Sequence, residues 1–201
     1  MIRNTAVTVC GPLNVNKLGV TYVHEHLMVK PQLPDEYYIP YTLDDEAAST
    51  EETRSFSAAG GETLVEMTPI NYGRNVKAYQ RIAQATGVHV ICCTGFHKQL
   101  FMPPWFGDKT DGELYDILMD EVTNGLDDTE IHPGVIKLGT SFEEVTAAEK
   151  RSIEAVARVH RDTGIPISTH CDKGTMGMDQ LRLLEKHGIY YQLYTGLIEN
   201  D

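Results

Sequence analysis

Residues 146–170, TAAEKRSIEAVARVHRDTGIPISTH, contain one complete helix–glycine–strand unit. Thr146 and Glu149 have the spacing of a capping box, in which each side chain satisfies an exposed backbone N–H at the start of a helix. Gly164 has the position of a left-handed cap that ends the helix. A β-rich run follows at once, so this stretch predicts a helix that leads directly into a strand.

The same pattern recurs along the chain, with helices predicted at residues 75–86 and 175–187 and a second capping box at Thr110 and Glu113. The strand candidates are residues 20–26, 62–67, 88–94, 134–139, 165–170 and 189–195. Most are apolar without clean alternation, which is typical of parallel strands covered by helices. Alternating strands and helices predict either an open doubly wound sheet or a closed barrel. The absence of a GxGxxG motif and of a Walker loop favours the barrel.

Composition excludes several classes of protein. The chain has 201 residues, of which 41% are hydrophobic and 23% are charged, as in ordinary soluble globular proteins. Its formal net charge of -12 disfavours nucleic-acid binding, which needs a basic face. No apolar run reaches the ~18 residues of a membrane span, and the N-terminus lacks the apolar core of a secretory signal. We therefore expect a cytoplasmic protein with no nucleic-acid or membrane partner.

The four cysteines, Cys10, Cys92, Cys93 and Cys171, include no CxxC pair. We expect them to be small buried residues in a reducing compartment rather than a disulfide framework or a zinc ribbon. Cys92 and Cys93 are adjacent, so on a strand they should face opposite sides. A hairpin is expected near residues 7–15, before the repeating units begin.

The stretch GVTYVHEHL, residues 19–27, is the most informative for chemistry. His24 and His26 are two residues apart, so on a strand they project from one face and Glu25 from the other. Two imidazoles at a strand end can chelate one divalent metal ion. The alternative is that one or both histidines only satisfy local hydrogen bonds.

Lys137 lies near the end of a short apolar strand in PGVIKLGTS, residues 133–141. A lysine between apolar neighbours must snorkel to water, pair with an anion or lose its charge. A neutral amine can add carbon dioxide to form a carbamate, whose two oxygens could bridge two cations. An ordinary snorkelling lysine is the alternative for this position.

His170 ends a strand in GIPISTHCDKGT, residues 164–175, and strand ends are where the chemistry of barrel enzymes gathers. A satisfied core or surface histidine is the alternative. His97 comes just after the third strand candidate and is a candidate for lining a substrate pocket. Structural roles are expected for the remaining four histidines, His89, His132, His160 and His187.

Taken together, these motifs resemble the phosphotriesterase family of binuclear metal hydrolases. His-x-His on the first strand, lysine on the fourth and histidine on the fifth occur in the family's order. The stretches GGETLVEMTPINYGR (residues 60–74) and TGVHVICCTGFH (residues 86–97) fall where that family's motifs fall. The resemblance covers roughly residues 10–188. It implies an α/β fold, a TIM-type (β/α)8 barrel of which five to six units are present.

The resemblance also implies a site with two divalent metal ions, zinc being the expected metal, and a small ester as substrate. His24 and His26 would bind the more buried ion, and His170 the more exposed one. Lys137, as a carbamate, would bridge both ions and serve as the catalytic lysine. A metal-bridging hydroxide would attack a lactone or a phosphoester. The resemblance is compatible with a homodimer.

The sequence departs from the family pattern near its C-terminus. The family has a further histidine on the sixth strand and an aspartate on the eighth, but Leu197 stands at the first position and the chain ends at Asp201. We therefore expect one barrel domain, residues 1–201, that lacks its C-terminal part and is weak or inactive in hydrolysis. A non-catalytic remnant with a partial metal half-site is the alternative, and an isomerase that uses one ion is a third hypothesis.

Overall fold

The computed structural model describes residues 4–33, 42–190 and 194–197. Within them, six strands form one sheet in the order of the sequence, and every neighbouring pair is parallel. The strands are β3 (Thr21–Glu25), β4 (Thr63–Glu66), β5 (His89–Gly95), β6 (Val135–Thr140), β7 (Ile167–Cys171) and β8 (Tyr194–Leu197). The helices between them are α2 (Glu46–Ala58), α3 (Val76–Thr86), α4 (Asp111–Asn124), α5 (Ala147–Thr163) and α6 (Gly177–Lys186).

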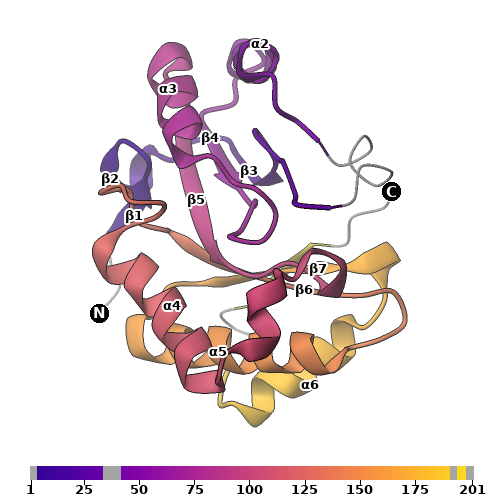
Figure 1. The fold of residues 1–201 in the computed structure, drawn as a ribbon. Coiled ribbons are helices and arrows are strands. Elements are labelled where there is room, and N and C mark those ends of the chain that lie inside the picture. The colour runs from indigo at the N-terminus through magenta and orange to yellow at the C-terminus, as the bar shows by residue number, and fades with distance from the viewer. Residues whose placement is uncertain (1–3, 34–41, 191–193, 198–201) are drawn as a thin grey trace.

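The strand order decides between the two predicted architectures. A doubly wound sheet reverses its strand order at a switch point, whereas a barrel adds each strand beside the previous one. This sheet runs from β3 to β8 without reversal. It is also curved, and helices α3 to α6 lie along its outer side (Figure 1). The prediction of a partial TIM-type barrel is confirmed.

A small hairpin precedes the parallel sheet, as predicted. Its strands are β1 (Thr5–Thr8) and β2 (Gly11–Asn14), and the Val9 N–H donates to the Val90 carbonyl of β5 at 2.8 Å. Cys10 lies in the turn of this hairpin and is exposed, whereas the other three cysteines are buried. The expectation that every cysteine is buried is therefore wrong for Cys10, because a turn tip faces solvent.

Local sequence signals predict most of the helix ends correctly. Both predicted capping boxes form, with Thr110 and Glu113 at α4 and with Thr146 and Glu149 at α5. Gly164 takes the left-handed conformation that ends α5, at φ 71°. The described residues also contain four short 3₁₀ turns: η1 (Val15–Lys17), η3 (Gln99–Phe101), η4 (Pro104–Asp108) and η5 (Asp172–Gly174).

Two elements differ from the sequence prediction. Helix α2 was not predicted, because its sequence EAASTEETRSFSA has no apolar stripe and only Thr53 is buried. The last strand was predicted at residues 189–195, but β8 spans Tyr194–Leu197, and residues 191–193 lie outside the described part of the chain. The apolar run IYYQLY does not by itself show where pairing with β7 begins.

The core lies on both faces of the strands. Ile136 and Leu138 of β6 pack with Ile153 of α5 beneath the helices. On the opposite face, Val135 packs with Cys93 and Met67. Cys92 belongs to the separate cluster between β5 and α3, so the two adjacent cysteines do face opposite sides, as predicted.

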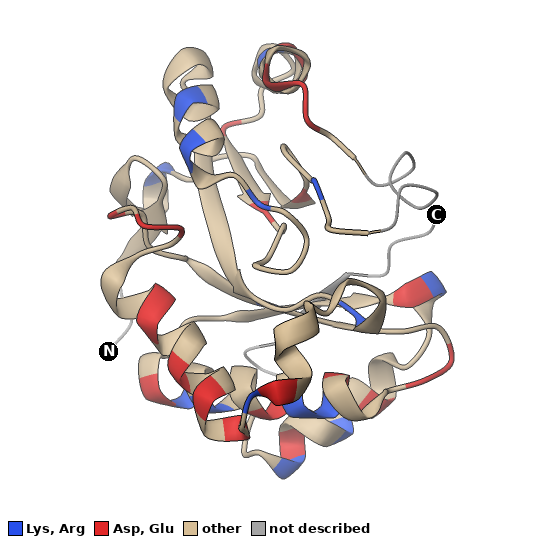
Figure 2. Cartoon of the chain, in the orientation of Figure 1, with Lys and Arg blue, Asp and Glu red and all other residues tan. Residues whose placement is uncertain are grey.

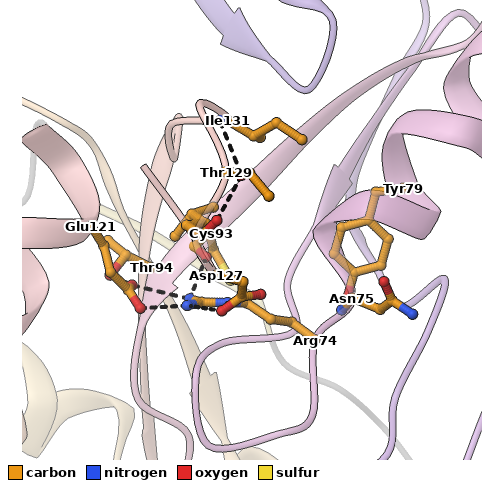
Figure 3. Close-up of polar contacts among 10 residues, drawn as sticks. Arg74, Asn75, Tyr79, Cys93, Thr94, Glu121, Asp127, Thr129 and Ile131 are labelled. Atoms are coloured by element: carbon orange, nitrogen blue, oxygen red, sulfur yellow. Dashed lines mark hydrogen bonds and ion pairs between the residues drawn. The ribbon is translucent and has the colours of Figure 1, made fainter. Parts of the chain in front are cut away.

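A buried ionic cluster holds the connection between β4 and α3. The guanidinium of Arg74 donates to Glu121 of α4 and to Asp127 in the following loop, with 3.0 Å from Nη1 to Glu121 Oε2 and 2.8 Å from Nη2 to Asp127 Oδ1. Figure 3 shows Arg74 between these two carboxylates. The Thr94 hydroxyl also donates to Glu121. Since the Arg74 side chain is only 3% exposed, the cluster fixes the loop that leads away from β4.

Charged residues are concentrated on the helices, and the strands contain few of them (Figure 2). Within the described residues, β3 has a neighbouring strand on one side only. Tyr22 and Val23 of β3 are exposed, as is Val20, which directly precedes it. A groove of about 510 Å³ runs between β3 and α2 and reaches Glu25 and His26. None of the helices in the described part of the chain has the length and apolar character needed to cross a bilayer.

Candidate metal centre and active site

The parallel sheet brings the candidate side chains to the carboxyl ends of the strands. His24 lies in β3, His26 directly follows it, Lys137 lies in β6 and His170 lies in β7. The register pairs His170 with Gly139. Because Lys137 and Gly139 lie on one face of β6, Lys137 and His170 share that face.

Lys137 contacts the first histidine of the pair. Its Nζ lies 2.9 Å from Nε2 of His24. An ammonium only donates hydrogen bonds, so a charged Lys137 finds an acceptor in the unprotonated Nε2. The lysine is 0% exposed, although His24 itself is half-buried. Lys137 therefore does not snorkel to solvent, which removes one alternative left open by its sequence.

His26 is tied to the end of β4. Its Nδ1 lies 2.7 Å from the hydroxyl of Thr68, and that hydroxyl lies 2.6 Å from Oε1 of Glu66. Glu66 is 0% exposed, and burial raises the pKa of its carboxyl to about 8 despite the hydrogen bonds that it accepts. The ring centroids of His24 and His26 are 5.4 Å apart, so the two side chains lie next to each other.

His97 packs among aromatic rings. Its ring centroid lies 4.9 Å from that of Phe101, 4.6 Å from that of Tyr72 and 4.6 Å from that of His170. The His97 backbone N–H donates to Oδ1 of Asn71 at 2.7 Å. His97 thus joins His170 to an aromatic wall, and its role in lining a substrate pocket stays a prediction.

The surroundings keep His97 neutral. Burial lowers its pKa well below the usual 6.5, and positive charge on His170 and Lys137 lowers it further. Among the described residues, its buried Nδ1 has no hydrogen-bond partner. A Cβ at Gly139 would lie 2.9 Å from that atom, so glycine at this position leaves room for the ring.

The other histidines have the structural roles expected of them where contacts are seen. Nδ1 of His160 lies 2.8 Å from the Ile165 carbonyl, and Nδ1 of His132 lies 3.0 Å from the Val122 carbonyl. Both contacts join a helix to the segment after it. In the part of the chain that the structure describes, no group of three or more His, Cys, Asp or Glu side chains is placed to hold a metal ion.

The fold and the motif order can now be compared with known proteins. Residues 4–192 match the sequence profile described as Phosphotriesterase family. The chain belongs to the phosphotriesterase family. The resemblance inferred from the motifs is therefore confirmed.

Two relatives and one solved structure give the extent of the similarity. The Phosphotriesterase homology protein of Escherichia coli (strain K12) is 33% identical over 178 residues, covering 88% of this chain and 61% of that protein. The Phospho-furanose lactonase of Mycoplasmopsis synoviae (strain 53) is 32% identical over 195 residues, covering 89% of this chain and 55% of that protein. A lactonase from Listeria monocytogenes has a similar crystal structure, with a TM-score of 0.90 at 30% identity, covering 96% of this chain and 64% of that one.

Two of these three relatives are named as lactonases. The chain spans between 55% and 64% of the length of the three proteins. The backbone register pairs Leu197 of β8, where the resemblance led us to expect a further histidine, with His170 of β7.

Sequence reasoning missed the residues around the end of β4, namely Glu66, Thr68, Asn71 and Tyr72. They contact His26 and His97 directly or through one another. One signal was present: polar residues directly follow the second strand candidate, and the ends of barrel strands gather functional side chains. No spacing within that stretch identifies its partners, which lie on other strands.

Proposed function

We propose that this site hydrolyses a small ester with the help of two divalent metal ions, zinc being the expected metal. The proposed ligands are His24, His26, Lys137 and His170. The observation that carries the proposal is the 2.9 Å contact between Nζ of a fully buried Lys137 and Nε2 of His24. When bound, such ions supply a Lewis acid that polarises the ester oxygen and lowers the pKa of water.

The donors fit a metal pair if Lys137 supplies oxygen atoms. Its neutral amine would form an N–C bond to carbon dioxide and release one proton, giving a carbamate with two oxygens. Burial favours this modification because an isolated ammonium is costly away from water. The carbamate would then stand beside His24, with His26 next to it and His170 on the same face.

The remaining residues of the site would position the substrate. His97, Phe101 and Tyr72 form a packed wall beside His170. A neutral His97 can accept or donate a hydrogen bond without adding charge, and the rings exclude water from the organic part of an ester. Lactonases among the relatives favour a lactone over a phosphoester as the substrate class.

Metal content and hydrolysis, measured on the same samples, test this proposal. The purified chain is loaded with Zn²⁺ in bicarbonate buffer, and bound zinc is counted before a lactone and an aryl phosphotriester are offered. We expect Lys137→Ala to abolish both tight zinc binding and lactone hydrolysis. Lys150→Ala, which removes an exposed lysine on α5, should leave both unchanged.

The alternative is a non-catalytic chain that keeps a partial metal half-site. We expect slow hydrolysis by the 201-residue chain, because Leu197 stands at the position of a ligand in the family pattern. Zinc binding that depends on Lys137 with no detectable hydrolysis would favour the half-site. Full zinc binding by Lys137→Ala would contradict the shared ligand proposed here.

A further inference from the structure

We infer that Thr68 and Glu66 position His26 by fixing which of its two ring nitrogens carries the proton. Nδ1 of His26 lies 2.7 Å from the Thr68 hydroxyl, and the hydroxyl lies 2.6 Å from Oε1 of Glu66. The three side chains form a continuous line of hydrogen bonds from the end of β3 to the end of β4. We call this line the His26 relay.

Backbone donors set the direction of the His26 relay. The Leu27 N–H donates to Oε1 of Glu66 at 3.2 Å, and the Thr68 N–H donates to Oε2 at 3.0 Å. When Glu66 is ionised, both carboxyl oxygens act only as acceptors, and the Thr68 hydroxyl donates its one proton to Oε1. Towards His26 that hydroxyl offers only a lone pair, so Nδ1 of His26 must be the protonated nitrogen.

The position of the His26 relay makes this preference strong. Thr68 and Glu66 are both 0% exposed, so water does not compete for their hydrogen bonds. The His26 backbone N–H donates to Oε1 of Glu25 at 2.8 Å, and the His26 and Tyr72 rings pack in a T-shaped arrangement with their centroids 5.4 Å apart. Both the main chain and the ring of His26 are thus held in place.

This inference rests on the proposed function for its consequence. With the proton on Nδ1, Nε2 of His26 presents its lone pair and can bind a metal ion. Histidine ligands usually donate their other ring N–H to a fixed acceptor, and loss of that acceptor costs about 10–100-fold in metal affinity. Thr68 and Glu66 are therefore positioning residues, which act on the ligand and not on the ion.

Three variants of the full chain test the His26 relay. Thr68→Val removes the hydroxyl at nearly constant volume, and Thr68→Ser restores it. Thr94→Val is the matched control, because Thr94 is also 0% exposed and also donates to a buried glutamate, Glu121, away from the imidazoles. Long-range ¹H–¹⁵N spectra of the metal-free proteins report the tautomer of each histidine, with His26 assigned from a His26→Asn sample. The spectra are recorded above pH 8, where Glu66 is ionised.

We expect the Nδ1–H form of His26 in the wild type, in Thr68→Ser and in Thr94→Val. In Thr68→Val the Nε2–H form should rise, and Zn²⁺ affinity measured by calorimetry should fall about 10–100-fold. An Nε2–H tautomer in the wild type, or an unchanged tautomer in a folded Thr68→Val, would overturn the inference. If Thr68→Val does not fold, Glu66→Gln serves instead, because an amide group cannot accept hydrogen bonds at both ends.

The two readouts separate this inference from the proposed function. A tautomer that responds to Thr68 in a chain that binds no zinc supports the His26 relay and contradicts the metal site. Zinc binding with a tautomer that ignores Thr68 supports the metal site and contradicts the His26 relay.

Discussion

Lys137 and Glu66 are both wholly buried, yet their neighbours differ in kind. Lys137 stands beside an imidazole nitrogen, whereas Glu66 accepts hydrogen bonds from the Leu27 N–H and from both the hydroxyl and the N–H of Thr68. The apolar neighbours of Lys137 in the sequence left three outcomes open, and the structure shows that its side chain is buried. The sequence neighbours of Glu66 did not reveal its hydrogen-bond partners, because these depend on how the ends of β3 and β4 lie next to each other.

Glu66 should make the stability of the chain depend on pH. Its pKa is about 8 in the folded protein against an ordinary 4.5, so the folded state holds a proton that the unfolded state has lost. That contribution is fully present below pH 4.5 and is lost as pH rises through 8. Glu66→Gln cannot titrate, so its unfolding free energy relative to wild type should rise between pH 5 and 9. Urea denaturation across this range checks the difference, and parallel pH curves would contradict the raised pKa.

Arg74 should contribute more to stability than any exposed arginine. Removing one partner of a buried ion pair leaves an uncompensated charge and costs about 3–5 kcal/mol, so we expect Arg74→Ala to lower the unfolding free energy by that amount. Arg81→Ala is the control, since Arg81 pairs with Glu46 at the surface and such pairs contribute about 0–1 kcal/mol. If chemical denaturation gave equal losses of unfolding free energy for Arg74→Ala and Arg81→Ala, the Arg74 cluster would not be buried in solution.

At the scale of elements, the two capping boxes have the same spacing, a threonine followed three residues later by a glutamate, but different surroundings. Glu113 of α4 is about half exposed and bonds within its own helix end and to Lys109. Glu149 of α5 is 0% exposed and also accepts from the Gln99 N–H at 2.8 Å and the Ser141 hydroxyl at 2.6 Å. The cap of α5 therefore joins the loops that follow β5 and β6.

Replacing these two glutamates should separate local capping from tertiary anchoring. Glu113→Ala removes a cap contact and should cost about 0.5–1 kcal/mol. Glu149→Ala also leaves buried donors without an acceptor, at about 1–3 kcal/mol each, so its loss should be several times larger. Thermal or urea unfolding of both variants checks the ratio. A similar loss in both would mean that Glu149 does not hold the loops.

At the scale of the whole molecule, repetition made the fold predictable. Each helix–glycine–strand unit is local, so capping boxes, glycine ends and apolar runs located α3 to α6 and the strands up to β7. Helix α2 escaped because almost none of its surface is buried. The meeting of His24 with Lys137, 113 residues apart, could be inferred from sequence only through the family resemblance, whereas the His26 relay needed the side-chain geometry.

The central claim is that Lys137 becomes the shared ligand of a metal site. The most direct test is a ¹³C NMR spectrum of the chain loaded with Zn²⁺ in ¹³C-bicarbonate, compared with Lys137→Ala and the exposed-site control Lys150→Ala. Our account predicts one carbamate resonance in the wild type and in Lys150→Ala, absent from Lys137→Ala and accompanied by bound zinc. Zinc binding with no carbamate resonance, or a resonance that survives in Lys137→Ala, would contradict it.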